Sequence, residues 1–280
     1  MKVAVFGANG KFGGFVTREL RDHGYEVTAF DRVPGGDAVL IDMGDYGQVL
    51  EAVQALDEHH DGVDAIVHLA AIPAPGRATD AATFHNNVPA TYNVFKAASV
   101  AGIDNVVWTS SETTLGLPFS AAAPPPYLPV DEEVLRPETT YALGKHLEEQ
   151  MAIQFARWNP GLKIIGLRLS NVMRPEDYEE FDTWQDDPTR RQWNAWGYID
   201  GRDGAQAVRL ALESGLTGFE RFIIANSDTV MRAPSAELAA TYFPDVPLAR
   251  EVRGRETLLS IDKARRLLGY EPSHNHYGDA

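Results

Sequence analysis

Apolar and polar residues alternate along the chain in blocks that predict strands followed by helices. Residues 3–6 form a short apolar run, which is typical of a buried strand. From Phe12 to His23 the apolar residues recur at helical spacing, and Gly24 then ends the predicted helix. A second β-rich run follows at residues 26–30. The chain therefore opens with a predicted βαβ unit.

The alternation continues to residue 268. Further strands are predicted over residues 39–41, 65–71, 106–110, 162–169 and 222–225, and further helices over 46–57, 80–102, 137–158, 203–213, 234–242 and 262–268. The almost continuously apolar run at 65–71 is expected of a central parallel strand covered on both faces. The pattern predicts an α/β fold with a doubly wound parallel sheet. We expect a main domain over residues 1–170 and a small C-terminal substrate lobe, interleaved with it, over residues 171–280.

Composition narrows the class of protein. The chain has 280 residues, 44% of them apolar and 23% charged, as in ordinary globular proteins. Its formal net charge of −15 opposes nonspecific attraction to nucleic acid or to anionic membranes. Because the chain has no cysteine, disulfides, thiolate metal sites and a cysteine nucleophile are excluded, and we predict no metal site. No transmembrane or signal-peptide pattern is found, so a cytoplasmic location is expected.

A glycine-rich turn joins the first predicted strand to the first helix. Gly7, Gly10 and Gly13 allow a tight turn, close approach of the backbone to a pyrophosphate, and close packing of helix on strand. Asp31 follows the second strand, where an acidic group accepts hydrogen bonds from an adenosine ribose. This order of strand, turn, helix, strand and acid favours a dinucleotide site over a turn that needs glycine for steric reasons alone.

The residues around position 31 bear on which dinucleotide is bound. Asp31 repels a 2′-phosphate and so favours NAD. Arg32 and Lys11 lie near enough to offer a phosphate compensating charge, which leaves NADP as the alternative. We predict NAD.

Proton-transfer chemistry is predicted on the helix over residues 137–158. Tyr141 and Lys145 are four residues apart and therefore project from one face of that helix. A buried ammonium beside a phenol favours the phenolate, which lowers the tyrosine pKa towards the operating range. Such pairs are also common on solvated helix surfaces, but the N-terminal βαβ unit favours the catalytic interpretation. Ser111, at the end of a neighbouring strand, is placed to hold the substrate oxygen by a hydrogen bond.

Three other features have two interpretations each. The proline-rich segment 118–129, which cannot be helix or central strand, is either a loop over the site or a simple connection. Aromatic residues between 175 and 196 either stack on a sugar ring or pack the second lobe, and packing is favoured for each one. His68 lies inside an apolar strand, where a core residue is commoner than a ligand, so we assign it no chemistry.

Taken together, these motifs resemble the extended short-chain dehydrogenase/reductase superfamily and, within it, the NAD-dependent epimerase/dehydratase family. The resemblance covers nearly the whole chain and rests on Gly7 to Gly13 with Asp31, Asp42-Met43, His68 to Ala71, Asn87-Val88, Thr91 to Asn93, Ser110-Ser111, Tyr141 to Lys145, Arg168 to Val172, and Asp262-Lys263 with Leu268 to Pro272. It implies a Rossmann-type fold and a homodimer formed through the helices over 80–102 and 141–158.

The resemblance also implies roles for individual residues. Tyr141 is implied to be the catalytic acid/base, Lys145 to bind the nicotinamide ribose and lower the tyrosine pKa, and Ser111 to polarise the substrate oxygen. Tyr141 and Lys145 also join the implied cofactor-binding residues, which are otherwise Gly7, Asn9, Gly10, Lys11, Phe12, Gly13, Asp31, Arg32, Asp42, Met43, Leu69, Ala70, Ala71 and Asn87. The candidate substrate-binding residues are Ile72, Ser111, Glu112, Thr113, Asn171 and Arg174.

Departures from the family's patterns limit the reaction. Glu112 is followed by Thr113 where dehydratases of the family carry two acidic residues, so one carboxyl group is missing. The segment between Asn171 and the following aspartate, Asp200 or Asp203, is shorter than in the family's sugar-nucleotide enzymes, which implies a smaller substrate.

We therefore predict an enzyme of carbohydrate metabolism, an NAD(P)-dependent oxidoreductase. It moves hydride between the nicotinamide and a secondary alcohol or ketone of a small sugar-like substrate. One alternative is an NAD-dependent sugar or nucleotide-sugar 4-epimerase. An alternative of another class is a non-catalytic regulator that senses NAD(P).

Overall fold

A seven-stranded sheet organises the structure, which is a computed structural model describing residues 1–278. The strand order is β3-β2-β1-β4-β5-β6-β9, with a reversal of order between β1 and β4. The strands are β1 (Lys2–Phe6), β2 (Glu26–Asp31), β3 (Val39–Leu40), β4 (Ala65–His68), β5 (Asn105–Ser111), β6 (Lys163–Leu169) and β9 (Gly218–Ile224). β1 pairs in parallel with β2 and β4, β2 with β3, and β4 with β5. This order is that of the Rossmann fold, in which ligands bind where the strand order reverses.

The chain divides into two compact units, each assembled from three segments. The first comprises Met1–Ser110, Thr139–Leu167 and Val208–Arg221. The second comprises Ser111–Glu138, Arg168–Ala207 and residues 222–278. Each unit is therefore built from parts of the chain that lie far apart in the sequence.

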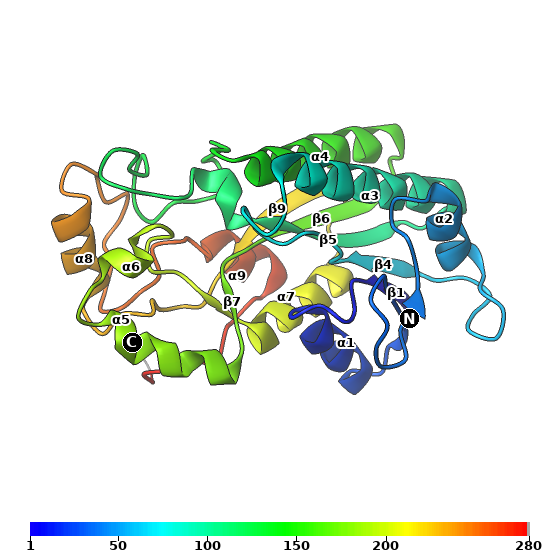
Figure 1. The fold of residues 1–280 in the computed structure, drawn as a ribbon, viewed down its shortest axis with the longest axis horizontal. Coiled ribbons are helices and arrows are strands. Elements are labelled where there is room, and N and C mark those ends of the chain that lie inside the picture. Colours follow the sequence, from blue (N-terminus) through cyan, green and yellow to red (C-terminus); the bar gives the residue numbers. More distant parts are fainter. Residues whose placement is uncertain (279–280) are drawn as a thin grey trace. The chain divides into compact units, whose positions relative to one another are not determined.

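Helices cover the sheet of the first unit. They are α1 (Gly13–Asp22), α2 (Tyr46–Gln54), α3 (Asp80–Ala101) and α4 (Thr140–Trp158). Figure 1 shows α2, α3 and α4 along one face of the sheet and α1 on the other. The side chains of Asp45, Thr79 and Thr139 cap the N-termini of α2, α3 and α4, respectively, by accepting hydrogen bonds from backbone N–H groups.

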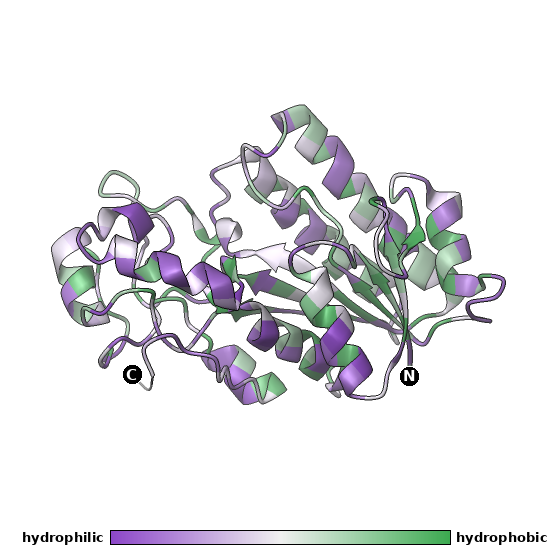
Figure 2. Ribbon diagram, turned by 60° about the horizontal axis from the view of Figure 1, so that its bottom comes forward, coloured by the Kyte–Doolittle hydropathy of each residue, from purple (hydrophilic) through white to green (hydrophobic). Residues whose placement is uncertain are grey.

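The core of the first unit lies between the strands and these helices. The strands are the most hydrophobic elements in Figure 2, and residues 3–6 of β1 are fully buried. Trp108 of β5 packs edge-to-face on Phe95 of α3, with ring centroids 5.2 Å apart. A Cβ on Gly166 of β6 would lie 2.7 Å from the Trp108 ring, so the neighbouring strand admits this large indole only because it carries glycine there.

Short elements make up the second unit. They are η1 (Glu112–Leu115), β7 (Val172–Met173), η2 (Pro175–Glu180), α5 (Phe181–Trp184), α6 (Thr189–Gln192), β8 (Ile199–Asp200), α8 (Ser235–Tyr242) and α9 (Asp262–Leu268). α7 (Gly201–Glu213) begins here and ends in the first unit. The rings of Phe181, Trp184 and Trp196 are at most 5% exposed, so these aromatic residues pack the unit, as the favoured interpretation held.

The observed boundaries correct several predicted ones. β4 ends at His68 rather than residue 71, and the helix predicted from residue 137 begins at Thr140, because Thr139 caps it. α2 ends at Gln54 rather than Asp57, since Ala55 is extended and Leu56 bridges to His60. The proline-rich segment 118–129 forms no helix or named strand, as predicted, but Leu128 bridges to Leu248 within the second unit.

Within residues 1–278, no helix has both the length and the apolar character needed to cross a bilayer.

Candidate active site

The turn after β1 is built so that only glycine fits at its ends. Gly7 has φ +89°, and a Cβ on it would lie 2.6 Å from the backbone nitrogen of Ala70. A Cβ on Gly13 would lie only 2.1 Å from the carbonyl oxygen of Gly7. The turn therefore packs directly against the chain that follows β4 on one side and against α1 on the other. This close packing brings backbone to the edge of the sheet where the strand order reverses.

The carboxylate of Asp31 holds this turn to the end of β2. Its Oδ2 accepts a hydrogen bond from the backbone N–H of Asn9 at 2.9 Å, and its Oδ1 accepts one from the backbone N–H of Val33 at 2.9 Å. A carboxylate offers about four lone-pair sites, so Asp31 keeps acceptor capacity for a ribose hydroxyl. The side chain of Asn9 donates to the carbonyl oxygen of Val33 at 2.7 Å and closes the same loop.

A cavity of about 400 Å³ lies at this edge, entirely within the first unit. Ten of the predicted cofactor residues line it: Gly7, Asn9, Gly10, Asp31, Arg32, Asp42, Met43, Leu69, Ala70 and Ala71. The predicted residues Lys11, Phe12, Gly13, Asn87, Tyr141 and Lys145 are not among its lining residues, and Gly13 packs behind the turn. The glycine turn, the acidic residue and the small residues Ala70 and Ala71 fit a dinucleotide that extends from β2 across β1 to β4.

Sequence reasoning missed six further residues that line the cavity: Val33, Ile41, Gly44, His85, Asn86 and Ala90. The resemblance includes Asn93 of α3 but gave it no role; its Nδ2 donates to the carbonyl oxygens of Met43 at 2.9 Å and Gly44 at 3.1 Å. The sequence signal for such a residue is an asparagine on the inner, apolar face of a predicted helix, because a buried side-chain amide needs a hydrogen-bond partner. Asn93 finds that partner in the loop after β3.

Asn87 holds the loop that follows β4. Its Oδ1 accepts from the backbone N–H of Ile72 at 2.8 Å, and its Nδ2 donates to the carbonyl oxygen of Ile72 at 3.0 Å. Both bonds fix the backbone of a residue that was predicted to contact the substrate. In this structure the side-chain amide of Asn87 thus fixes the backbone conformation of Ile72.

Tyr141 and Lys145 lie in the first and second turns of α4, and both are buried, at 7% and 2% exposure. Nζ of Lys145 donates to the carbonyl oxygen of Thr109 at 2.9 Å and to Oε2 of Glu148 at 2.9 Å. Burial works against the ammonium, but attraction by Glu148 and Tyr141 outweighs it, so the pKa of Lys145 is raised above its ordinary value. Lys145 therefore stays protonated throughout the physiological range.

Ser111 is the last residue of β5 and the first residue of the second unit, whereas Tyr141 and Lys145 belong to the first. Its Oγ accepts hydrogen bonds from the backbone N–H of Thr113 at 3.2 Å and from the Thr113 hydroxyl at 2.9 Å. With two donors directed at its oxygen, the Ser111 hydroxyl has its own proton left to donate. Donation to an oxygen is the role that a residue polarising a substrate carbonyl requires.

Glu112, a candidate substrate residue, is 4% exposed inside the second unit. Its Oε2 accepts from Oγ of Ser170 at 2.6 Å, and its Oε1 accepts from Nδ2 of Asn194 at 3.3 Å. Burial raises the pKa of Glu112 to about 7, although these hydrogen bonds work in the opposite direction. The carboxyl group therefore titrates near neutral pH.

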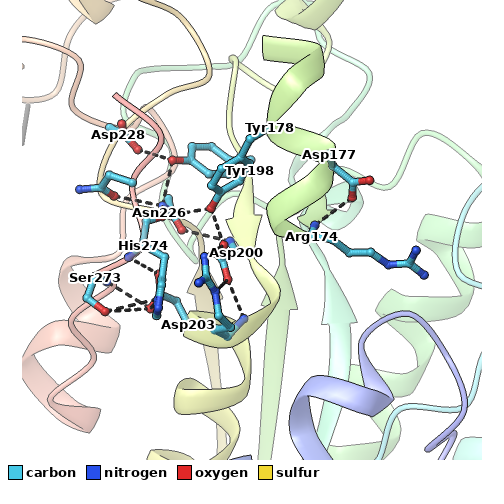
Figure 3. Close-up of polar contacts among 12 residues, drawn as sticks. Arg174, Asp177, Tyr178, Tyr198, Asp200, Asp203, Asn226, Asp228, Ser273 and His274 are labelled. Atoms are coloured by element: carbon cyan, nitrogen blue, oxygen red, sulfur yellow. Dashed lines mark hydrogen bonds and ion pairs between the residues drawn. The ribbon is translucent and has the colours of Figure 1, made fainter. Parts of the chain in front are cut away.

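Arg174 and Asn171 flank β7 in the second unit. The backbone N–H of Arg174 donates to Asp177 at 2.8 Å, and its guanidinium, 46% exposed, lies 3.7 Å from Glu176. The carbonyl oxygen of Asn171 accepts from the backbone N–H of Ile199. In Figure 3 the guanidinium of Arg174 points away from the polar cluster that surrounds Asp200.

That cluster, which we call the Asp200 cluster, fixes η2 and the chain around residue 274. It consists of Tyr178, Tyr198, Asp200, Arg202, Asp203, Asn226, Asp228 and His274 (Figure 3). The hydroxyl of Tyr178 donates to Asp200, and the imidazole of His274 lies 2.7 Å from Asp203. Segments 174–180 and 273–275 are thereby held within one hydrogen-bonded network.

The sheet order, glycine turn, acidic residue and Tyr-x-x-x-Lys helix define a Rossmann-type dinucleotide enzyme of the short-chain dehydrogenase/reductase kind. The sequence profile of the NAD-dependent epimerase/dehydratase family matches residues 3–185. The chain belongs to this NAD-dependent family. The predicted fold class and family are thus confirmed.

Similar proteins include both dehydrogenases and epimerases. The chain is 27% identical to an L-arabinose 1-dehydrogenase (NAD(P)(+)) of Haloferax volcanii, over 98% of this chain and 97% of that protein. It is 26% identical to a UDP-glucose 4-epimerase of Corynebacterium glutamicum, over 98% of this chain and 92% of that protein. Among solved structures, a short-chain dehydrogenase/reductase superfamily protein of Agrobacterium tumefaciens with bound NAD has a TM-score of 0.72 at 22% identity, covering 98% of this chain and 93% of that one. These relatives confirm the prediction of an NAD(P)-dependent enzyme.

Proposed function

We propose that the protein is an NAD-dependent dehydrogenase that oxidises a hydroxyl-bearing carbon of a small, free sugar or sugar acid. The observation that carries this proposal is the length of the match to its relatives. The alignment with the arabinose dehydrogenase spans 284 residues, whereas that with the Corynebacterium glutamicum UDP-glucose 4-epimerase spans 317. The shorter alignment agrees with the short segment between Asn171 and Asp200, which leaves little room for a nucleoside diphosphate.

In this proposal the residues of α4 move the proton. Bound NAD supplies the hydride acceptor. The phenolate of Tyr141, stabilised by the protonated Lys145, takes the hydroxyl proton of the substrate and becomes a neutral phenol. Ser111 donates its hydroxyl proton to the substrate oxygen, because Thr113 already fills the acceptor side of that hydroxyl. Glu112, Thr113, Ile72, Asn171 and Arg174 remain candidate substrate residues.

The proposal is tested by screening pentoses, hexoses, uronic acids and UDP-sugars for the appearance of NADH. We expect turnover with a free sugar or uronic acid and none with a UDP-sugar. A uronic acid preference implicates Arg174 in binding the carboxylate, and Arg174→Ala then raises KM for the uronic acid but not for a neutral sugar. Tyr141→Phe is expected to abolish turnover and to leave NAD binding nearly intact. Full turnover by this variant contradicts the mechanism.

A 4-epimerase is the second candidate, favoured by the relatives that carry this name. An epimerase returns the hydride to its substrate and shows no net reduction. Stoichiometric NAD in the purified protein, together with conversion of a UDP-sugar without any NADH, supports the epimerase and refutes the dehydrogenase. The relatives named above are enzymes, which disfavours a purely NAD-sensing role.

We also propose a homodimer formed through α3 and α4, with a cytoplasmic location as the expected setting. These helices pack side by side in the first unit (Figure 1) and expose large apolar side chains, of which Tyr92 is 45%, Leu143 43% and Trp158 58% exposed. Leu143→Asp is expected to yield a monomer by light scattering, whereas Leu248→Asp, an exposed position in the second unit, is expected to leave a dimer. A monomeric parent protein refutes this part of the proposal.

A further inference from the structure

The ammonium of Lys145 forms an ion pair with a buried carboxylate that lies outside the Tyr-x-x-x-Lys motif. Glu148 follows Lys145 by nearly one turn of α4, and the lysine Nζ lies 2.9 Å from Oε2 of Glu148. The side chain of Lys145 is 3% exposed and that of Glu148 is 0% exposed. Because both groups are removed from solvent, their attraction is only weakly screened. Removing the charge of Glu148 is therefore expected to change the stability of the Lys145 ammonium directly.

The groups that α3, β5 and β4 direct towards this pair are neutral, so they do not compete with Glu148 for the Lys145 ammonium. The Thr91 hydroxyl of α3 and the Trp108 indole of β5 face Glu148. His68 of β4 lies 3.2 Å from the Thr91 hydroxyl, and burial together with the charge of Lys145 lowers the pKa of His68 to about 3. The imidazole is therefore neutral at physiological pH and adds no competing charge.

The other titratable groups near the pair are Tyr141 and Glu149 of α4 and Arg221 of β9. Glu149 is as fully buried as Glu148, but its Oε1 accepts a hydrogen bond from the Ser110 hydroxyl at 2.7 Å, and its Oε2 lies 3.9 Å from Arg221. The two adjacent glutamates thus have different hydrogen-bond partners, although the charge of Glu149 also contributes to raising the pKa of Lys145. Glu149 serves as a matched control for Glu148.

We propose that Glu148 is a positioning residue that holds Nζ of Lys145 beside Tyr141, keeps the lysine protonated, and so sets the pH range in which the tyrosine works. This inference rests on the proposed function, in which Tyr141 exchanges the substrate proton. The carboxylate of Glu148 affects both ionisable groups. It stabilises the ammonium of Lys145, and it offsets part of the positive charge that would otherwise favour the phenolate of Tyr141.

Glu148→Gln removes the charge of the side chain but keeps its size and a carbonyl oxygen that can accept a hydrogen bond from Lys145. The variant therefore tests the electrostatic effects apart from the packing. The phenol then feels more of the ammonium charge, so the ascending limb of the kcat/KM profile moves to lower pH by about one unit. The buried ammonium also loses its counterion, so the pKa of Lys145 falls. A descending limb is expected to appear at alkaline pH where the parent enzyme has none.

The test compares the pH profiles of the parent, Glu148→Gln and Glu149→Gln, with NAD and the sugar that gives the highest turnover in the screen described above. A one-unit shift of the ascending limb equals about a tenfold rise in kcat/KM at a fixed pH on that limb. We expect the full shift and the new descending limb in Glu148→Gln and a smaller change in Glu149→Gln, whose carboxylate attracts the Lys145 ammonium without bonding to it. A Glu148→Gln profile that superimposes on the parent profile, or an equal change in Glu149→Gln, overturns the proposal.

A spectroscopic readout tests the same inference without turnover. Isotope-labelled tyrosine allows ionisation of the phenols to be followed by NMR, and the signal lost in Tyr141→Phe identifies Tyr141. In Glu148→Gln this signal is expected to titrate about one pH unit lower than in the parent, with and without NAD. An unshifted signal contradicts the proposal even where activity changes.

Glu148→Asp covers the case in which glutamine prevents folding. It keeps the charge but withdraws the carboxylate by one methylene group, so the ascending limb stays in place while KM for NAD rises severalfold, because Nζ is held less firmly. Unchanged KM for NAD in this variant overturns the positioning role. The two proposals fail separately: turnover by Tyr141→Phe refutes the proposed function, whereas an inactive Tyr141→Phe with an unaltered Glu148→Gln refutes only the role of Glu148.

Discussion

Two adjacent glycines at the start of α1 are expected to respond oppositely to alanine. A Cβ on Gly13 would lie 2.1 Å from the carbonyl oxygen of Gly7 and 2.6 Å from that of Ala8, and both contacts are to backbone that cannot rotate away. A Cβ on Gly14 would meet nothing within 4 Å. The same chemical change is therefore made at one closed and one open position of a single helix.

The contacts set the size of the effect. Overpacking of this kind costs about 1–3 kcal/mol, and the gain from replacing a helical glycine by alanine is at most about 1 kcal/mol. Gly13→Ala should therefore lose about 1–2 kcal/mol of unfolding free energy, which corresponds to a melting temperature lower by roughly 2–8 °C. Gly14→Ala should melt at the parent temperature or slightly above it.

Binding of NAD should follow the same pattern, because the displaced carbonyl oxygen belongs to the turn that lines the cavity. A change of about 1.4 kcal/mol in binding free energy is tenfold in Kd, and we expect a shift of the Gly7 backbone to change the Kd of Gly13→Ala by about that factor in titration calorimetry, with no change in Gly14→Ala. Equal melting temperatures and equal Kd values for the two variants would refute the argument that close packing, rather than mere flexibility, requires glycine at position 13.

Three further predictions follow from the polar contacts. Asp31→Ser removes the charge that repels a 2′-phosphate and should raise the ratio of kcat/KM for NADP over NAD at least about tenfold; an unchanged ratio shows that Arg32 dominates. Asp203→Asn weakens its bonds to the backbone N–H of His274 and to the imidazole, and should lower unfolding free energy by about 1–3 kcal/mol in denaturant titrations; full stability would mean that the Asp200 cluster does not anchor this segment. Because burial raises the pKa of Glu112 to about 7, the folded state binds its proton more tightly than the unfolded state, so this group's contribution to stability falls as pH rises from about 4.5 to 7. Glu112→Gln should flatten that part of the melting-temperature profile, and an equally steep profile would contradict it.

The long elements of the first unit were predictable because periodicity and caps agree there. Asp45 precedes α2 and Gly102, with φ +72°, follows α3, so local signals mark the ends of elements that the apolar pattern already indicates. In the second unit, α8 and α9 were predicted in the same way, since the predicted helices over 234–242 and 262–268 match them. The other short elements of this unit were not, because β7 and β8 have two residues each and α5 and α6 have four, which is too short for any period to show in the sequence.

The cofactor cavity was predictable where its residues belong to motifs. The glycine turn and Asp31 follow a fixed order along the chain, Asp42-Met43 and Leu69 to Ala71 belong to stretches that resemble the family, and all of these line the cavity. Val33, His85 and Asn86 line the same cavity from loop and helix positions that carry no motif. Their approach depends on how β2, β4 and α3 are arranged in space, and spacing along the sequence does not contain that information.

The burial of charged residues is the feature of this fold that the hydropathy pattern predicts least well. Lys145, Glu148 and Glu149 occupy positions of α4 that a polarity pattern assigns to solvent, yet each is at most 2% exposed. Burying three charges on one helix face costs free energy unless partners are already in place, and here Thr109, Ser110 and Arg221 supply them from β5 and β9. Because each charge is stable only in contact with its partner, the same contacts that offset the cost of burial also fix the lysine ammonium in position. A proton-transfer site needs its cation held in this way, since an ammonium free to move would not hold the tyrosine pKa at one value.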